Sequence, residues 1–345
     1  MSKPTSPLWE LTVCRTKEFL REPEAVFWVF MFPLVLAVAL GFAFREKPPD
    51  RTPVGVVAGP AAGDAVAALQ RSLLLQPRVL AEAEGREALR TGKISLLVVP
   101  GPPAVFHFDE TRPDSRIARL AAEDALQRAA GRRDPIPVRE ELVTEKGARY
   151  IDFLIPGLLG MNLMGTGVWS IAFSVTTARN KKLLKRLLAT PMRKSDYLLA
   201  QMLSRLSFLV LEIVFLVGFG WIAFGVAVRG SFVLLLAICL LSALCFCGMG
   251  LLIASRVTTI EGASGLANLV MMPMWLLSGV FFSSERFPNA VQPFIRALPL
   301  TAVNEALRAV INEAKPLTAV APQLAIVAAW GLLSFVVALK IFRWR

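Results

Sequence analysis

Long hydrophobic segments recur along most of the chain, separated by shorter polar ones. A helix needs about 20 mostly apolar residues to cross a bilayer, because the hydrocarbon layer is about 30 Å thick and a helix rises about 1.5 Å per residue. Six segments meet this length, at residues 25–44, 151–178, 203–228, 232–254, 263–282 and 319–342. This pattern predicts an all-α polytopic membrane protein with six transmembrane helices.

The residues before the first span have a different pattern. Wound as a helix, "SPLWELTVCRTKEFLREPEAV" places apolar and charged residues on opposite sides, which is typical of a helix lying in the membrane interface. The apolar side holds Leu8, Trp9, Val13, Phe19 and Leu20, and the charged side holds Glu10, Lys17, Glu18 and Arg21. We expect residues 1–45 to form an N-terminal amphipathic helix and the first span; a plain charged flank is the alternative.

Residues 46–150 show the patterns of a folded domain. "TPVGVVAG" and "ISLLVVPG" are short β-like runs, and "AVFHFDE" alternates apolar and polar residues. "DSRIARLAAEDALQRAAGR" has helical spacing, with Asp114 or Ser115 as its expected cap. The block is long enough for a core of its own. It is therefore predicted to be a small α/β extracytoplasmic domain, inserted between the first and second spans.

The remaining residues, 151–345, are predicted to form a transmembrane domain of five helices. Residues 284–317 lie between the last two spans and mix apolar with polar residues. Pro288, Pro293 and Pro299 interrupt them, so this stretch is too broken for a span and too apolar for an exposed loop. We expect a re-entrant segment of short helices on the outer side, covered by protein where the backbone is broken.

Composition supports a membrane protein and fixes its orientation. The chain is 55% hydrophobic and 19% charged, and it has a net charge of +12. The basic excess belongs to the apolar part, since residues 46–150 are near neutral. Bases dominate the loop after residue 178 and the tail that ends in Arg343 and Arg345. The positive-inside rule therefore predicts that both termini are cytoplasmic, and it explains the charge without nucleic-acid binding.

Sequence signatures of enzymes are missing. The chain has no GxxxxGK[ST], HExxH or GxSxG motif, and its single histidine, His107, lies in a β-like run. Its four cysteines suggest neither a disulfide framework nor a zinc site. We therefore expect no enzyme, and no cofactor or metal in this chain.

The stretch 180–192 is the most distinctive part of the chain. If it is helical, Leu183, Leu184, Leu187 and Leu188 share one face. Bases occupy the other face, and Pro191 ends the helix. A regular leucine face at the membrane surface is unfavourable unless something covers it. A partner protein would cover it; a basic loop resting on anionic lipid is the alternative.

An acidic residue lies within the third span. Glu212 stands in "LVLEIVFLV", and a carboxylate at that depth costs about 2.5–3.5 kcal/mol on insertion scales. It should therefore face protein or water. It either belongs to the transport path, pairing with a cationic substrate or setting a gate, or is hydrogen-bonded to a neighbour such as Asn162, Ser170 or Asn268. Both interpretations stay open.

Smaller features of the spans have structural explanations. Asp152 is expected to cap the second span, and Arg308 to pair with Glu305 or a loop carboxylate. The second span also holds four glycines that allow close helix approach, either between two protomers or within one. They are Gly157, Gly160, Gly165 and Gly167.

Three stretches resemble the signature regions of ABC type-2 exporter permeases, the membrane subunits of ATP-binding-cassette transporters. They are "YIDFLIPGLLGMNLM", "KKLLKRLLATPMRKSDYLLAQMLSR" and "MMPMWLLSGVFFSSERFPNAVQPFIRALPLTAVNEALRAV". The resemblance implies that residues 180–192 are a coupling helix, which docks on a separate ATPase subunit carrying ATP and magnesium. It also implies a dimer with a second permease chain, contact with membrane lipids, and a place in the bacterial cytoplasmic membrane.

On this resemblance, the leucine face would be buried against the ATPase, while Lys185, Arg186 and Arg193 would form a polar rim. Glu212, Asn162 and Asn268 are the candidates for the transport path. The expected cargo is a drug-like, lipid or polysaccharide-type substrate. A membrane-anchored receptor that uses the extracytoplasmic domain is the alternative function. A lipid-modifying enzyme would need clustered histidines or acids, which the sequence lacks.

Overall fold

The computed structural model describes residues 7–44, 51–133, 136, 149–189 and 194–342. The chain divides into two compact units. One unit comprises Met1–Arg45 and Thr144–Arg345, and the other is Glu46–Val143. Each has its own hydrophobic core, so each is described by itself.

Five helices of the first unit are long and apolar enough to cross a membrane. They are α7 (Tyr150–Asn180), α9 (Lys194–Phe224), α10 (Phe232–Ala254), α11 (Ile260–Leu277) and α14 (Leu317–Ile341). Helix α10 has the predicted bounds, and its N-cap Ser231 accepts a hydrogen bond from the Leu234 amide. Helix α9 begins earlier than expected and ends before Gly225, whose φ of 68° stops the helix.

The first predicted span is interrupted. It consists of α2 (Pro23–Val26), the π-helical turn η1 (Phe27–Met31) and α3 (Phe32–Ala43). Pro33 has no amide hydrogen for the i−4 bond, which accounts for the wider turn just before it. The longest apolar helix here, Phe27–Ala43, is shorter than the other five. Within the described residues, five full-length spans are therefore present, and the sixth stays a prediction.

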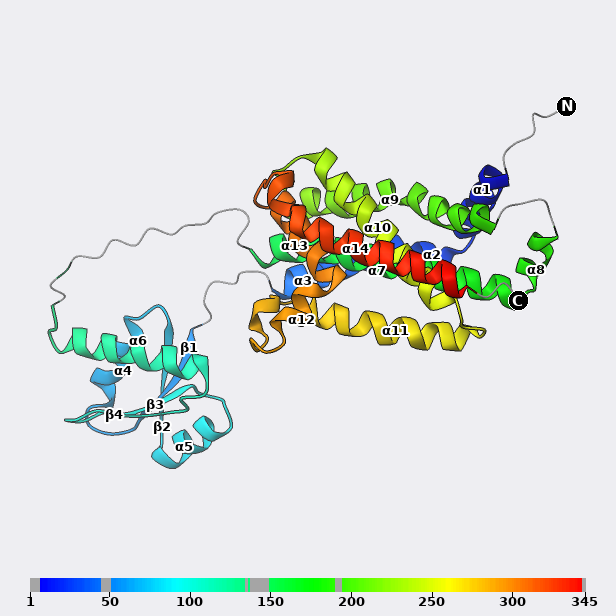
Figure 1. The fold of residues 1–345 in the computed structure, drawn as a ribbon. Coiled ribbons are helices and arrows are strands. Elements are labelled where there is room, and N and C mark those ends of the chain that lie inside the picture. Colours follow the sequence, from blue (N-terminus) through cyan, green and yellow to red (C-terminus); the bar gives the residue numbers. More distant parts are fainter. Residues whose placement is uncertain (1–6, 45–50, 134–135, 137–148, 190–193, 343–345) are drawn as a thin grey trace. The chain divides into compact units, whose positions relative to one another are not determined.

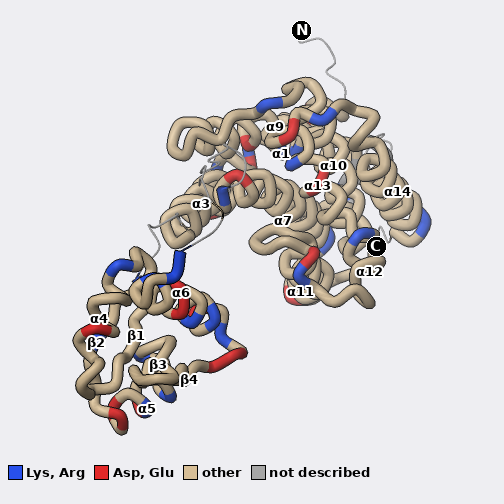
Figure 2. The backbone as a smooth tube through the Cα atoms, turned by 90° about the vertical axis from the view of Figure 1, so that its left-hand side faces the viewer, with Lys and Arg blue, Asp and Glu red and all other residues tan. Residues whose placement is uncertain are grey.

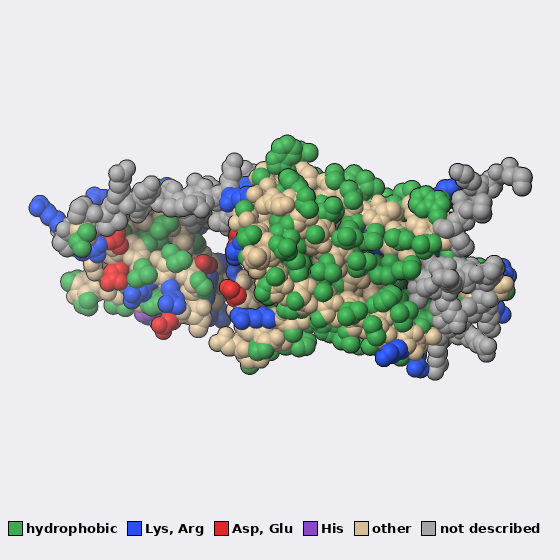
Figure 3. All heavy atoms as spheres, turned by 45° about the horizontal axis from the view of Figure 1, so that its top comes forward, with side chains coloured by type: hydrophobic (Ala, Val, Ile, Leu, Met, Phe, Trp, Pro, Cys, Tyr) green, Lys and Arg blue, Asp and Glu red, His purple; other side chains and the backbone are tan. Residues whose placement is uncertain are grey.

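Helices α7 and α10 form the centre of this unit. In the apolar windows of α7 and α10, 67% and 56% of the residues are buried, whereas the shares in α9, α11 and α14 are 28%, 22% and 17%. The outer helices therefore present apolar side chains outward, as a lipid environment requires, and one such face is visible in Figure 3. Most of α10 and α14 carries no acidic or basic residue (Figure 2).

Glycines allow the two central helices to touch. A Cβ atom on Gly250 of α10 would lie 2.7 Å from the Val168 carbonyl oxygen, and one on Gly167 of α7 would lie 2.8 Å from Phe246 Cβ. Gly157 and Gly160 likewise face neighbours in their own chain. Only Gly165, among the four glycines of α7, leaves room for a Cβ atom, which would make an ordinary contact with Met271 Cε at 4.0 Å. The structure thus supports close packing within one protomer.

The segment between α11 and α14 folds as short helices separated by prolines. These are the 3-10 turn η2 (Ser284–Arg286), α12 (Gln292–Ala297) and α13 (Pro299–Ile311). Helix α13 is largely buried and contacts both α7 and α14. Figure 1 shows α12 and α13 at one end of the bundle, and α1 (Pro7–Leu20) and α8 (Leu183–Leu188) at the other end.

Helix α1 packs lengthwise on the first turns of α9. The rings of Phe19 and Phe208 are 4.4 Å apart, and the guanidinium of Arg15 lies 6.0 Å from the Tyr197 ring. Trp9 and Leu20 are more than half exposed on another face of α1. The helix therefore packs one apolar face on α9 and exposes another, and its position in the membrane interface stays a prediction.

The second unit has a four-stranded sheet in the order β2-β1-β3-β4. Its elements are β1 (Thr52–Val57), α4 (Ala62–Gln70), β2 (Leu75–Leu80), α5 (Glu82–Arg90), β3 (Leu96–Val99), β4 (Val105–Phe108) and α6 (Pro113–Ala129). Strands β1, β2 and β3 are parallel, and β4 is antiparallel to β3. Leu96 and Val98 pack with the core that involves α4 and α6, whereas Leu97 packs with α5. This alternation places helices on both faces of the sheet.

Two details of this unit differ from the prediction. Strand β2 and helices α4 and α5 were not identified from the sequence, and Pro77 within β2 is tolerated because β2 is an edge strand. The cap of α6 is Arg112, followed by Pro113 at the first helical position. Asp114 and Ser115 were the expected caps, and this was wrong: proline begins the helix before them.

Candidate functional site

A buried ion pair lies within the spans. Nη2 of Arg205 is 2.6 Å from Oε2 of Glu212, and their side chains are 5% and 0% exposed. Asn162 of α7 donates a longer hydrogen bond of 3.5 Å to the same carboxylate oxygen. The negative charge of Glu212 is therefore compensated inside the chain, by a base seven residues earlier on the same helix.

This pair belongs to a larger set of polar contacts between α7 and α9, which we call the polar seam. Arg205 also donates to Thr166 Oγ1, and Ser174 donates a 3.1 Å hydrogen bond to Gln201 Oε1. Because the two helices run in opposite directions, these contacts follow one another along the interface. The polar seam comprises Asn162, Thr166 and Ser174 of α7 and Gln201, Arg205 and Glu212 of α9.

The three candidates for a transport path do not come together. Asn162 contacts Glu212, as expected for a hydrogen-bonded neighbour. Asn268 is half-buried on α11, and within the described part of the chain no hydrogen bond joins it to the pair. We expected Glu212 to form a hydrogen bond with an uncharged neighbour, but its main partner is Arg205. The spacing of seven residues, two helical turns, was the signal in the sequence that could have shown it.

The candidate coupling helix is short and begins at a sharp bend. Lys182 has a φ of 57°, which is uncommon for a residue with a side chain and turns the chain between α7 and α8. Helix α8 covers Leu183–Leu188, and residues 190–193, including Arg193, lie outside the described residues. The same applies to the side chains of Lys185, Leu187 and Leu188.

The described leucines of α8 point to different environments. Leu184 is 1% exposed and packs in this chain's own core, which includes Val175, Tyr197 and Leu251. Leu183 is 37% exposed, and Arg186 is also exposed. The prediction that Leu184 is free to bury against a partner therefore needs correction, since the ends of α7, α9 and α10 already cover it. Leu183 and Arg186 remain available for contact.

Hydrogen bonds join the end of α10 to α7, next to α8. Arg179 donates hydrogen bonds to the carbonyl oxygens of Ala254 and Val257, and its guanidinium lies 5.4 Å from the Phe342 ring. These are carbonyls that a helix end leaves without partners. Leu184 and Arg179 together hold the start of α8 against three of the long helices.

At the opposite end, α13 is bound to α7 through side chain to backbone contacts. Arg308 donates to the Phe153 and Gly279 carbonyl oxygens and lies 3.6 Å over the Phe153 ring. Its hydrogen bonds to described residues go to carbonyls, whereas we expected an ion pair with Glu305 or a loop carboxylate. Asp152 is confirmed as a cap: it accepts hydrogen bonds from the Arg149 amide and guanidinium.

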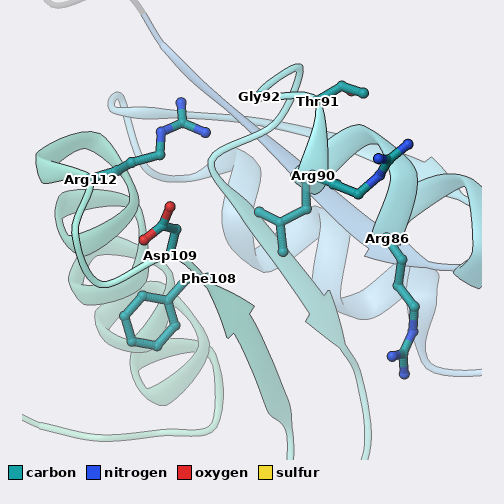
Figure 4. A pocket seen from close by; sticks show the side chains of 8 residues that line it. Arg86, Arg90, Thr91, Gly92, Phe108, Asp109 and Arg112 are labelled. Atoms are coloured by element: carbon teal, nitrogen blue, oxygen red, sulfur yellow. The ribbon is translucent and has the colours of Figure 1, made fainter.

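The second unit has an open pocket of about 530 Å³, shown in Figure 4. Arg86 and Arg90 point away from Arg112 and Asp109, and each is paired with a glutamate on its own helix. Two hydrogen bonds from Thr111 lower the pKa of the Asp109 carboxyl. The bases therefore do not converge on one point. The lining residues are Arg86, Leu89, Arg90, Thr91, Gly92, Phe108, Asp109 and Arg112.

Comparison with known families identifies the chain. The family model described as "ABC-2 family transporter protein" matches residues 24–340, which include the long helices, α8, α13 and the whole second unit. A comparison with curated proteins gave no match. Since the family match covers nearly the whole sequence, the chain belongs to the ABC-2 family of transporter membrane proteins.

Proposed function

We propose that this chain is the permease subunit of an ATP-driven exporter, working as a dimer coupled to separate ATPase subunits. ATP and magnesium bind on those subunits. Closure of the ATPases pushes on α8 and shifts the spans between an inward-open and an outward-open packing. Both termini and α8 are cytoplasmic, and the second unit is outside. The substrate is a drug-like, lipid or polysaccharide-type molecule.

The position of α8 is the observation that supports this function most directly. Leu184 fixes α8 to the core formed by α7, α9, α10 and α14, while Leu183 and Arg186 stay exposed beside it. A force applied to the exposed side would therefore reach several spans through Leu184. For this mechanism the chain needs two alternative packings of its spans. Binding of the partner changes the relative populations of these two packings.

A double variant tests the coupling. Leu183→Asp with Arg186→Glu should remove an apolar contact and reverse a charge at the docking surface. Burying a leucine contributes about 1.5–3 kcal/mol, which corresponds to about a 10- to 150-fold loss in affinity for the ATPase. We expect the ATPase to be lost in co-purification and substrate export to stop. Size-exclusion profiles should match the unaltered protein, because neither residue is in the core.

Lys181→Glu is the matched control. Lys181 is exposed at the same bend but lies before α8. If the stretch only rests on anionic lipid, reversing the charge of Lys181 or of Arg186 should weaken its contact with anionic lipid equally and leave ATPase binding unchanged. A double variant that still captured the ATPase and exported normally would contradict the proposal.

A further inference from the structure

The polar seam is asymmetric along its length. From the α8 end to the middle of the span, α9 presents Gln201, Arg205 and Glu212 to α7. Beyond Glu212 the contacts between the two helices become apolar: Gly220 of α9 faces Ile155. Leu158 and Leu216, which are buried in the same core, also lie beyond Glu212. The seam is therefore polar toward one end of the bundle and apolar toward the other.

Two buried atoms of the polar seam have no hydrogen-bond partner in the described part of the chain. They are Oε1 of Glu212 and Nε of Arg205. Both residues are at least nine-tenths buried. A buried polar atom without a partner costs about 1–3 kcal/mol, and more when the group is charged. Two such atoms, both on charged groups at one helix interface, require further partners.

Water is the ligand whose chemistry fits both atoms. Glu212 Oε1 needs a donor, whereas Arg205 Nε needs an acceptor, and a water molecule supplies both. Buried waters in proteins typically bond to polar groups that would otherwise have no partner. Lipid chains can offer no hydrogen bonds, and the apolar contacts beyond Glu212 block water from the far end.

We propose that the polar seam is a hydrated crevice, which water enters from the α8 end and which stops at Glu212. Its ligands are water molecules that bridge Glu212 and Arg205 between α7 and α9. The crevice brings the aqueous phase to a charged pair in the middle of the membrane while the outer half stays sealed. Only the identification of the α8 end as cytoplasmic rests on the proposed function.

Reactivity of introduced cysteines tests the crevice. Ser174→Cys and Thr166→Cys replace two small side chains of α7 that contact α9 in the polar seam, in a full-length chain without its native cysteines. The probe is a charged methanethiosulfonate that cannot cross membranes, added to either side of vesicles that contain the protein. We expect both cysteines to react at least about tenfold faster when the reagent is on the α8 side.

Ser334→Cys is the matched control. Ser334 is 1% exposed and lies in the contact between α14 and α10, close to Gly248. It stands about 10 Å along its helix from Ile341, whereas Thr166 stands about 21 Å from Asn180. Ser334→Cys is thus nearer a helix end than Thr166→Cys, yet it should stay unreactive because its surroundings are apolar.

Each result of the cysteine labelling supports or contradicts the proposed crevice. Fast reaction at both seam positions, with an unreactive Ser334→Cys, supports the crevice. If both seam cysteines react as slowly as Ser334→Cys, the seam is dry and the inference is wrong. If the seam cysteines react only with reagent on the side opposite α8, water enters from that end, and the inference is wrong. The proposed function is judged separately, by capture of the ATPase with the same variants.

Discussion

Arg205→Met is expected to destabilise the membrane unit by about 3–5 kcal/mol, because it leaves the Glu212 charge buried without its partner. The double variant Arg205→Met, Glu212→Leu should recover most of the loss, since two apolar side chains of similar size replace the whole pair. Thermal unfolding in detergent, followed by loss of monodisperse protein, measures both effects. Arg256→Met, at an exposed position, should change stability by less than about 0.5 kcal/mol.

The double variant also separates the two roles of Glu212. If the pair only holds α9 to α7, a stable double variant should export substrate at close to the normal rate. If Glu212 binds a cationic substrate or sets a gate, the double variant should be stable and inactive. A double variant as unstable as Arg205→Met alone would show that the pair is not the reason for the destabilisation.

Gly250→Ala should lower stability by about 1–3 kcal/mol, because its methyl group would lie 2.7 Å from the Val168 carbonyl oxygen of α7. The neighbouring atoms belong to backbone, so they cannot move aside as a side chain could. Gly250→Leu should prevent α7 and α10 from packing and give no monodisperse protein. Melting temperature and the yield of monodisperse protein are the measurements.

Gly218→Ala is the control for that substitution. Gly218 lies inside α9, and nothing stands within 4 Å of an added Cβ atom. Alanine is the better helix former by about 1 kcal/mol, so this change should be neutral or stabilising. Equal losses from Gly250→Ala and Gly218→Ala would indicate that close packing of α7 and α10 is not the cause.

Much of the membrane unit could be predicted from hydrophobic length. Helix α10 was predicted to the residue, because an unbroken apolar run between Ser231 and Ser255 leaves no other way to satisfy its backbone in lipid. The first span was harder, since Pro33 alters the hydrogen bonding inside an otherwise uniform apolar segment. In the second unit, the apolar strands β1 and β3 were visible, whereas β2 was hidden by Pro77 and by its exposed edge position.

The candidate site was predicted less completely. Glu212 was identified because a carboxylate in hydrocarbon needs an explanation, and Asn162 because it is polar and near in depth. Arg205 was missed as its partner. The leucines of α8 share a face in a helical projection, yet Leu184 and Leu183 lie in different surroundings. A projection shows which residues are neighbours, but not which neighbouring helix already covers them.

The sequence by itself determined which segments are long and apolar enough to cross a membrane, which loops carry the bases, and that a separate domain interrupts these segments, because these follow from local length and charge. Only the tertiary structure decided that Glu212 is paired with Arg205, that Leu184 is already buried, and that Gly250 and Gly167 bring α7 against α10. The physical reason is that burial and pairing depend on segments far apart in sequence. No local pattern records which helix lies beside which.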